Sequence, residues 1–172
     1  TLPRIQERML EPVVRDRRDI VDHTPNMELG FWPGGDRDGN PFVTSDLTIE
    51  IGNLLRASVL RRYQQDLEPL MRRLTFPGIS EKMQAIAEKL RLTANPLVRV
   101  SEIEGEAGSY CEDISEHAYQ SAEEFLEHLR DVQHELYEEH GGLFADRLEN
   151  LMLKVRMFGF HFASMDIRQD SR

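Results

Sequence analysis

Hydrophobic side chains recur every three or four residues along most of the chain, which is the period of an amphipathic helix. The clearest run begins at Ser45 or Asp46, residue types that cap helix N-termini, and continues to about Leu74. Pro69 lies near its end. We expect this proline to kink the helix or to split off its last turn, because it removes one backbone hydrogen bond and clashes with the preceding turn.

Weaker runs of the same period predict helices on both sides of this one. One or two helices are expected in 1–22, where Pro12 interrupts the pattern. A short helix capped by Ser80 is expected to end between 93 and 96, and mixed helix and loop should follow over 97–118.

Two further helices are expected in the C-terminal half. The first covers about 121–140 and opens with Ser121 and Glu124 at the spacing of a capping box. The adjacent pair Gly141 and Gly142 should end it, because glycine readily adopts the left-handed conformation at a helix C-terminus. The second covers about 143–157.

Two segments depart from the helical period. Residues 33–41 are so rich in glycine and proline that no helix can form there, and a short extended stretch near 29–33 precedes them. From 158 to 168 apolar and other side chains alternate, which predicts a strand over about 160–167. Its apolar body ends in charged residues, a pattern typical of a buried parallel strand that delivers polar groups to a site.

Composition narrows the class of protein. The chain has 172 residues, 40% hydrophobic and 30% charged, which excludes a disordered chain and a membrane-spanning one. The single cysteine excludes an intramolecular disulfide. The formal net charge is −10, and 101–150 holds 15 acidic and 2 basic residues. Nucleic acid is therefore an unfavourable partner, and an anionic ligand is expected to bind outside 101–150.

The sequence GFWPGGDRDGNPFVT at 30–44 is the first candidate site. Its glycines let backbone N–H groups approach an anion, and Arg37 stands between the carboxylates of Asp36 and Asp38. A purely structural turn is the alternative. A calcium loop counted from Asp36 is excluded, because Pro41 and Leu47 stand where an EF-hand needs glycine and glutamate.

The sequence MDIRQDSR at 165–172 is the second candidate. Strand alternation places Asp166 and Arg168 on one face, where the carboxylate can orient the guanidinium. A structural ion pair at a strand end is the alternative. No metal centre is predicted, because His134 and His140 are six residues apart and lie on different faces of a helix.

Together, FWPGGDRDGNPFVT at 31–44 and FGFHFASMDIRQDSR at 158–172 closely resemble two signature segments of the phosphoenolpyruvate carboxylases, in the same order. Pro33 and Asp170 depart from the usual methionine and glutamate. The resemblance implies carboxylation of phosphoenolpyruvate by bicarbonate, giving oxaloacetate and phosphate, with Mg²⁺ or Mn²⁺ as cofactor. By its DIRQ motif, Arg168 resembles a phosphate-binding arginine of that family.

The resemblance also implies roles for neighbouring residues. Asp166 and Gln169 would lie beside the phosphate-binding Arg168 and contribute to substrate binding. The residues of the GGDRDGNP motif resemble a cluster at the mouth of the family's barrel; they are Asp36, Arg37, Asp38 and Asn40. The resemblance implies that Arg37 is a second catalytic arginine and that the other three bind substrate.

The family's catalytic histidine segments, of the TAHPTE and FHGRGG types, are absent here, and its metal-binding carboxylates belong to a later part of the enzyme. We therefore expect 1–172 to be a single internal segment of a larger polypeptide, with an incomplete barrel and no activity alone. The expected fold is mainly α, a helical fragment of an α-rich (β/α)8-barrel enzyme with one or two short strands.

The expected partners are phosphoenolpyruvate, bicarbonate, the rest of the same polypeptide and further copies in a homo-oligomer. The expected location is the cytoplasm, with neither nucleic acid nor membrane as partner. The alternative is a non-catalytic helical interaction module that uses the acidic stretch 101–150 as its partner surface.

Overall fold

The computed structural model describes residues 29–38, 40, 42–102 and 117–168. Within these ranges the order of elements is β1 (Gly30–Phe31), α3 (Ser45–Met71), α4 (Ile79–Glu102), α5 (Ala122–His140), α6 (Ala145–Phe158) and β2 (Ser164–Met165). The mainly helical class with two short strands is thereby confirmed. The helices predicted in 1–22 lie outside the described residues, as do 103–116 and Gln169.

Helix α3 begins at Ser45, one residue earlier than a cap at Ser45 would allow and two earlier than a cap at Asp46 would allow. Its N-cap is Thr44, whose hydroxyl accepts a hydrogen bond from the backbone N–H of Leu47 at 3.2 Å. The helix runs through Pro69 to Met71, so the proline does not split off a last turn. Leu67 and Leu70, on either side of Pro69, are both buried, and their packing outweighs the single backbone bond that proline removes.

Helix α4 is longer than predicted. It begins at Ile79 and continues through Pro96 to Glu102, whereas the pattern had placed its end between 93 and 96. Leu90 and Ala94 are buried in the turns before this proline, so tertiary packing carries the helix past the residue that a local rule treats as a stop.

Helix α5 begins and ends as predicted. The hydroxyl of Ser121 accepts a hydrogen bond from the N–H of Glu124 at 3.1 Å, and the Glu124 carboxylate accepts one from the N–H of Gln120 at 3.0 Å. At the other end, Gly141 adopts a left-handed φ of 60° and donates its N–H to the carbonyl of Leu136. Both ends of the helix are thus determined by local sequence.

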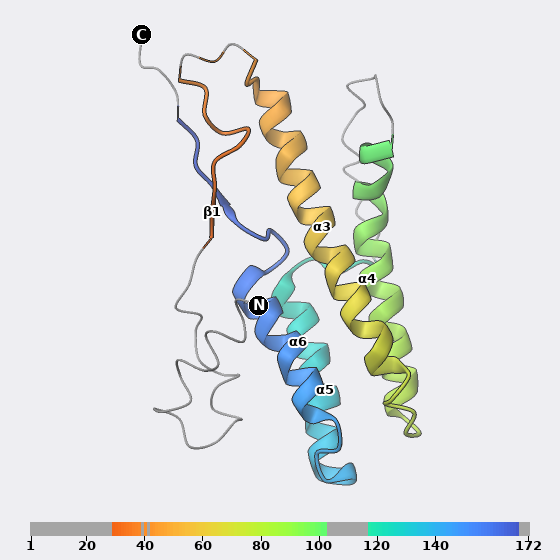
Figure 1. Cartoon of the computed structure of the whole chain (residues 1–172). Helices are drawn as coiled ribbons and strands as arrows, with labels where there is room; N and C mark the ends of the chain where they lie inside the picture. Colours follow the sequence, from red (N-terminus) through yellow and green to blue (C-terminus); the bar gives the residue numbers. More distant parts are fainter. Residues whose placement is uncertain (1–28, 39, 41, 103–116, 169–172) are drawn as a thin grey trace, which may run out of the picture.

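The four described helices enclose one hydrophobic core (Figure 1). Helix α3 packs on α4 and α6, and α5 packs on the same two helices. None of the helices in the described part is long and apolar enough to cross a membrane. The largest fully buried side chains are Leu60, Tyr63, Leu67, Leu74, Ile79, Met83, Leu90, Tyr119, Phe125, Leu129, Leu136 and Leu148.

The strand predicted over 160–167 is reduced to Ser164–Met165, and the one predicted near 29–33 to Gly30–Phe31. Residues 159–163 form a turn after α6, in which Gly159 and Phe162 have φ of 53° and 65°. The alternating phenylalanines that suggested a strand pack in other ways. Phe160 is buried in the bundle core, and Phe158 stacks on Phe162 with ring centroids 5.6 Å apart.

Candidate functional site

The two motif segments meet because β1 and β2 pair in parallel, although all four described helices lie between them in sequence. Figure 1 shows this pair beside the N-terminal half of α3, away from the helical core. The ladder begins with the N–H of Ser164 donating to the carbonyl of Leu29 at 2.8 Å and continues with Asp166 donating to Phe31 at 3.1 Å. The glycine-rich loop and the Asp-x-Arg segment are thereby fixed side by side.

Past the strands, the backbones of the two segments stay joined. The N–H of Arg168 donates to the carbonyl of Gly35 at 2.9 Å, and the N–H of Arg37 donates to the carbonyl of Arg168 at 2.8 Å. Asp36 and Arg168 form an isolated parallel bridge at this point. Because successive side chains of a strand point to opposite faces, Asp36 shares a face with Arg168, while Arg37 points to the other face, towards Thr48 on α3.

The turn at 32–35 requires its glycines for two different reasons. Gly34 has a φ of 80°, and a Cβ there would lie 2.1 Å from Cδ1 of Ile51 on α3. A Cβ at Gly35 would lie 2.0 Å from the carbonyl oxygen of Asp166. A side chain at Gly34 would be strained by the left-handed φ, and one at Gly35 would meet backbone, so these glycines permit the close approach of the loop to α3 and to the second segment.

One face of α3 supports both segments from behind. Thr48 contacts the loop, and a Cβ on Gly52 would lie 3.8 Å from the sulfur of Met165 on β2. Further along, the guanidinium of Arg56 lies 5.9 Å from the ring centroid of Phe160, and burial lowers the pKa of Arg56. Residues 48, 51, 52 and 56 share one helical face, which explains why the strand pair lies on α3.

Arg37 is held by α3. Its Nη2 donates a hydrogen bond to the hydroxyl of Thr48 at 3.2 Å, and that hydroxyl lies 2.7 Å from the carbonyl oxygen of Gly34. The Nε of Arg37 and Oδ1 of Asp36 are both buried, and neither has a hydrogen-bond partner among the described residues. Buried polar atoms without partners are uncommon and costly, which is typical of groups that meet a ligand or water.

The other predicted residues divide into two groups. Asn40 serves the turn itself, since its side-chain oxygen accepts a hydrogen bond from the N–H of Phe42 at 3.1 Å. Asp38, Asp166 and Arg168 are exposed. The sequence left open a structural ion pair for Arg168, but within the described ranges its guanidinium forms no ion pair. Gln169 lies outside these ranges.

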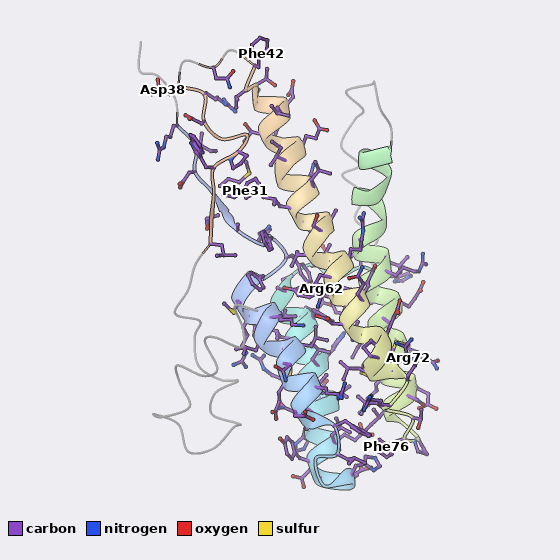
Figure 2. All side chains as sticks on the ribbon, in the orientation of Figure 1. Phe31, Asp38, Phe42, Arg62, Arg72 and Phe76 are labelled. Carbon is purple, nitrogen blue, oxygen red and sulfur yellow. The ribbon has the colours of Figure 1, made fainter. Side chains whose placement is uncertain are left out.

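Figure 2 shows where three phenylalanines lie, of which Phe42 is 83% exposed and Phe31 and Phe76 are half-buried. Phe31 on β1 and Phe42 on the loop lie beside the first turns of α3, together with Asp38, while Phe76 lies at the far end of the bundle. Trp32, which follows β1 directly, is 54% exposed. The charged cluster is therefore flanked by apolar surface.

The charges of the candidate site suit an anionic ligand. Two guanidinium groups, from Arg37 and Arg168, can each donate two parallel hydrogen bonds to a phosphate or a carboxylate. In the part of the chain that the structure describes, no three His, Cys, Asp or Glu side chains come close enough to hold a metal ion.

Sequence reasoning missed the residues of α3 that build the site. None of these residues is a large apolar one, so they interrupt the hydrophobic pattern of that helix; they are the polar Thr48, the small Gly52 and the charged Arg56. The one signal that could have found them is that they lie on one face of the helix. That face contains Ile51 but no continuous stripe of apolar side chains, unlike a face that packs in a core.

Fold and site together define a helical bundle that carries a glycine-rich loop with three charged residues, paired in parallel with an Asp-x-Arg strand end. The sequence profile of the phosphoenolpyruvate carboxylase family matches residues 1–101 and 79–172, which together span the chain. The chain therefore belongs to the phosphoenolpyruvate carboxylase family.

Individual relatives agree with this assignment. The phosphoenolpyruvate carboxylase of Prochlorococcus marinus (strain MIT 9301) is 30% identical over 99% of this chain and 21% of the relative. Those of Rhodopseudomonas palustris (strain HaA2) and Synechocystis sp. are each 31% identical, over 84% and 83% of this chain. The chain spans about a fifth of the length of these relatives, 18% and 17% in the last two cases.

Proposed function

We propose that this chain is one segment of a phosphoenolpyruvate carboxylase, which joins phosphoenolpyruvate and bicarbonate to give oxaloacetate and phosphate. The observation that carries the proposal is the backbone pairing of the two distant motif segments, in which Asp36 pairs with Arg168 and the N–H of Arg37 donates to the carbonyl of Arg168. Family membership supports the reaction, and the pairing supports an anion as the ligand of this site.

In this proposal Arg168 contacts the phosphate of the substrate, and Arg37 is the second catalytic arginine. The phosphoryl group passes to bicarbonate, which leaves an enolate of pyruvate and carboxyphosphate, and the enolate carbon then takes up the carboxyl group as phosphate departs. Guanidinium groups aimed at the transferring phosphoryl group stabilise the charge that develops there. Asp166 and Gln169 would orient this end of the substrate, while Asp36, Asp38 and Asn40 would shape the opposite loop.

The wider expectations belong to the same proposal. Mg²⁺ or Mn²⁺ would be bound by carboxylates of the parent polypeptide beyond this chain. Strands β1 and β2 would be two strands of an eight-stranded barrel, and the enzyme would be a cytoplasmic homo-oligomer that supplies oxaloacetate to central metabolism. The isolated 172-residue chain would be inactive, because one pair of arginines supplies only part of the stabilisation of the transition state.

The test is Arg168→Ala in the complete protein that carries this segment. We expect kcat/KM for phosphoenolpyruvate, followed as oxaloacetate formation, to fall by roughly a hundredfold or more, as expected for loss of a group that binds the reacting phosphate. Arg168→Lys should recover only part of the loss, because a lysine cannot donate two parallel bonds. Unchanged kinetics in Arg168→Ala would remove the assignment of Arg168.

A matched control is Arg61→Ala, since Arg61 is exposed on α3, outside the face that supports the strands. It should leave kcat/KM unchanged. The purified 172-residue chain should form no oxaloacetate, and measurable formation by it would contradict the expected inactivity. A helical interaction module, the rival hypothesis, would instead lose stability or partner binding in Arg168→Ala, without a carboxylase activity to lose.

A further inference from the structure

Thr48 links three parts of the site through one hydroxyl group. The side chain is 8% exposed and stands in the first turn of α3, where its backbone N–H donates to the carbonyl of Thr44 at 3.1 Å. Its Oγ1 lies 2.7 Å from the carbonyl oxygen of Gly34, 3.1 Å from that of Thr44, and 3.2 Å from Nη2 of Arg37.

The proton of this hydroxyl determines how it meets the arginine. A hydroxyl has one hydrogen and two lone pairs. Since the hydroxyl donates to the carbonyl of Gly34, the closest acceptor, its lone pairs remain for the guanidinium of Arg37. The loop carbonyl, the hydroxyl and the guanidinium therefore form an ordered chain of donors and acceptors anchored on α3.

We propose that Thr48 is a positioning residue that restricts the guanidinium of Arg37 to the orientation in which it binds the anionic substrate. The inference rests on the proposed function of Arg37. An arginine side chain free in solution samples many rotamers, and fixing one of them before the substrate arrives removes that entropic cost from binding.

The remaining hydrogen-bonding capacity of Arg37 supports this role. The contact with Thr48 uses one of five N–H groups, and the buried Nε has no acceptor among the described residues. A guanidinium anchored at one nitrogen and lacking a partner at another is prepared for a further acceptor, such as an oxygen of a phosphate or carboxylate.

The experiment compares Thr48→Val and Thr48→Ser in the complete protein, alone and combined with Arg37→Ala. Valine keeps the branched shape but cannot accept from Arg37, whereas serine keeps the hydroxyl. We expect Thr48→Val to lower kcat/KM for phosphoenolpyruvate by roughly tenfold to a hundredfold, and Thr48→Ser to retain most of it. In the Arg37→Ala background Thr48→Val should have no further effect.

Thr93→Val is the matched control. Thr93 is also a buried threonine in a helix, and its hydroxyl donates to the carbonyl of Lys89 at 2.8 Å while accepting from the N–H of Tyr119 at 2.9 Å. Its loss should lower the melting temperature without changing kcat or KM. A kinetic loss specific to Thr48→Val is therefore not explained by destabilisation.

Three results would overturn the inference; the first two leave the proposed function standing, and the third does not. If Arg37→Ala impairs the enzyme while Thr48→Val does not, or if Thr48→Val has its full effect without Arg37, then Thr48 does not position Arg37 and the proposed function stands. If Arg37→Ala has wild-type kinetics, the proposed role of Arg37 fails, and the role of Thr48 fails with it.

Discussion

Gly35 lies so close to Asp166 that a Cβ on the glycine would be 2.0 Å from the aspartate's carbonyl oxygen. This approach sets the distance between the two motif segments, and the hydrogen bond from the N–H of Arg168 to the carbonyl of Gly35 depends on it. The backbone pairing of the two motif segments is thus possible because residue 35 has no side chain.

Gly35→Ala should therefore separate the two segments. The methyl group meets backbone, which cannot move aside as a side chain can, so we expect a loss of about 2 kcal/mol or more in the free energy of unfolding or a local opening of the strand pair. Amide hydrogen exchange at Asp166 and Arg168, together with denaturant unfolding, measures both effects.

Gly30→Ala is the control for that substitution. A Cβ at Gly30, on the same motif, would lie 3.9 Å from Oδ2 of Asp166, an ordinary contact. It should change the free energy of unfolding by no more than about 0.5 kcal/mol. Equal effects of the two alanines would show that close approach is not what Gly35 provides.

Tyr63 connects the core to the segment that leads into β2. Its hydroxyl donates to the carbonyl of Gly159 at 2.7 Å, at the end of α6. Tyr63→Phe leaves that carbonyl without this donor and should cost about 1–2 kcal/mol. It should also speed amide exchange at His161 and Phe162, whose N–H groups donate to the carbonyl of Phe158.

Tyr119→Phe provides a comparison, because the hydroxyl of the buried Tyr119 lies 3.0 Å from Nδ1 of His128, away from this turn. Loss of the Tyr119 hydroxyl should lower the free energy of unfolding. Amide exchange at His161 and Phe162 should then become faster only as far as global unfolding becomes more frequent. If exchange at these two amides is faster than global unfolding allows in both variants, then the hydrogen bond from Tyr63 does not specifically stabilise the turn.

The ion pair between Lys89 and Glu124 should make the free energy of unfolding of the bundle depend on pH in the acidic range. The hydrogen bond from the Lys89 ammonium, and then that from the N–H of Gln120, holds the pKa of the Glu124 carboxyl below its usual value of 4.5. A carboxyl with a lowered pKa in the folded state stabilises the fold fully above its unfolded pKa. This contribution is lost as the pH falls through the folded value.

Glu124→Gln should consequently destabilise the protein at pH 7 by no more than about 1 kcal/mol, because the pair is partly exposed, and the difference from wild type should shrink below about pH 4.5. Thermal unfolding at several pH values measures this. Glu127→Gln, on the exposed face of α5, should leave the melting temperature at pH 7 nearly unchanged, and a deficit in Glu124→Gln that stays constant with pH would contradict the assignment.

Leu60 and Leu54, both on α3, test where the core lies. Leu60 is fully buried and Leu54 is 40% exposed. Leu60→Ala should cost about 2–5 kcal/mol in denaturant unfolding, whereas Leu54→Ala should cost about 1 kcal/mol or less. Similar losses would mean that the N-terminal half of α3 is as tightly packed as the half that faces α4 and α6.

Local sequence by itself determined the helical class, the caps of α5, and the identity of the two charged motifs. These follow from interactions within a few residues, such as the bond between Ser121 and Glu124 and the left-handed glycine at 141. The candidate residues Arg37 and Arg168 were recognisable because each stands in a short motif whose spacing is complete on its own.

Tertiary structure decided the rest. Packing carried α3 past Pro69 and α4 past Pro96, and it folded the alternating phenylalanines of 158–162 into a turn instead of a strand. It also paired the loop that carries Arg37 with the strand end that carries Arg168, and it brought Thr48 into hydrogen-bond contact with Arg37, since contacts between residues far apart in the chain leave no local pattern. Helix caps depend on neighbours in sequence, whereas strand length and site geometry depend on which surfaces bury one another.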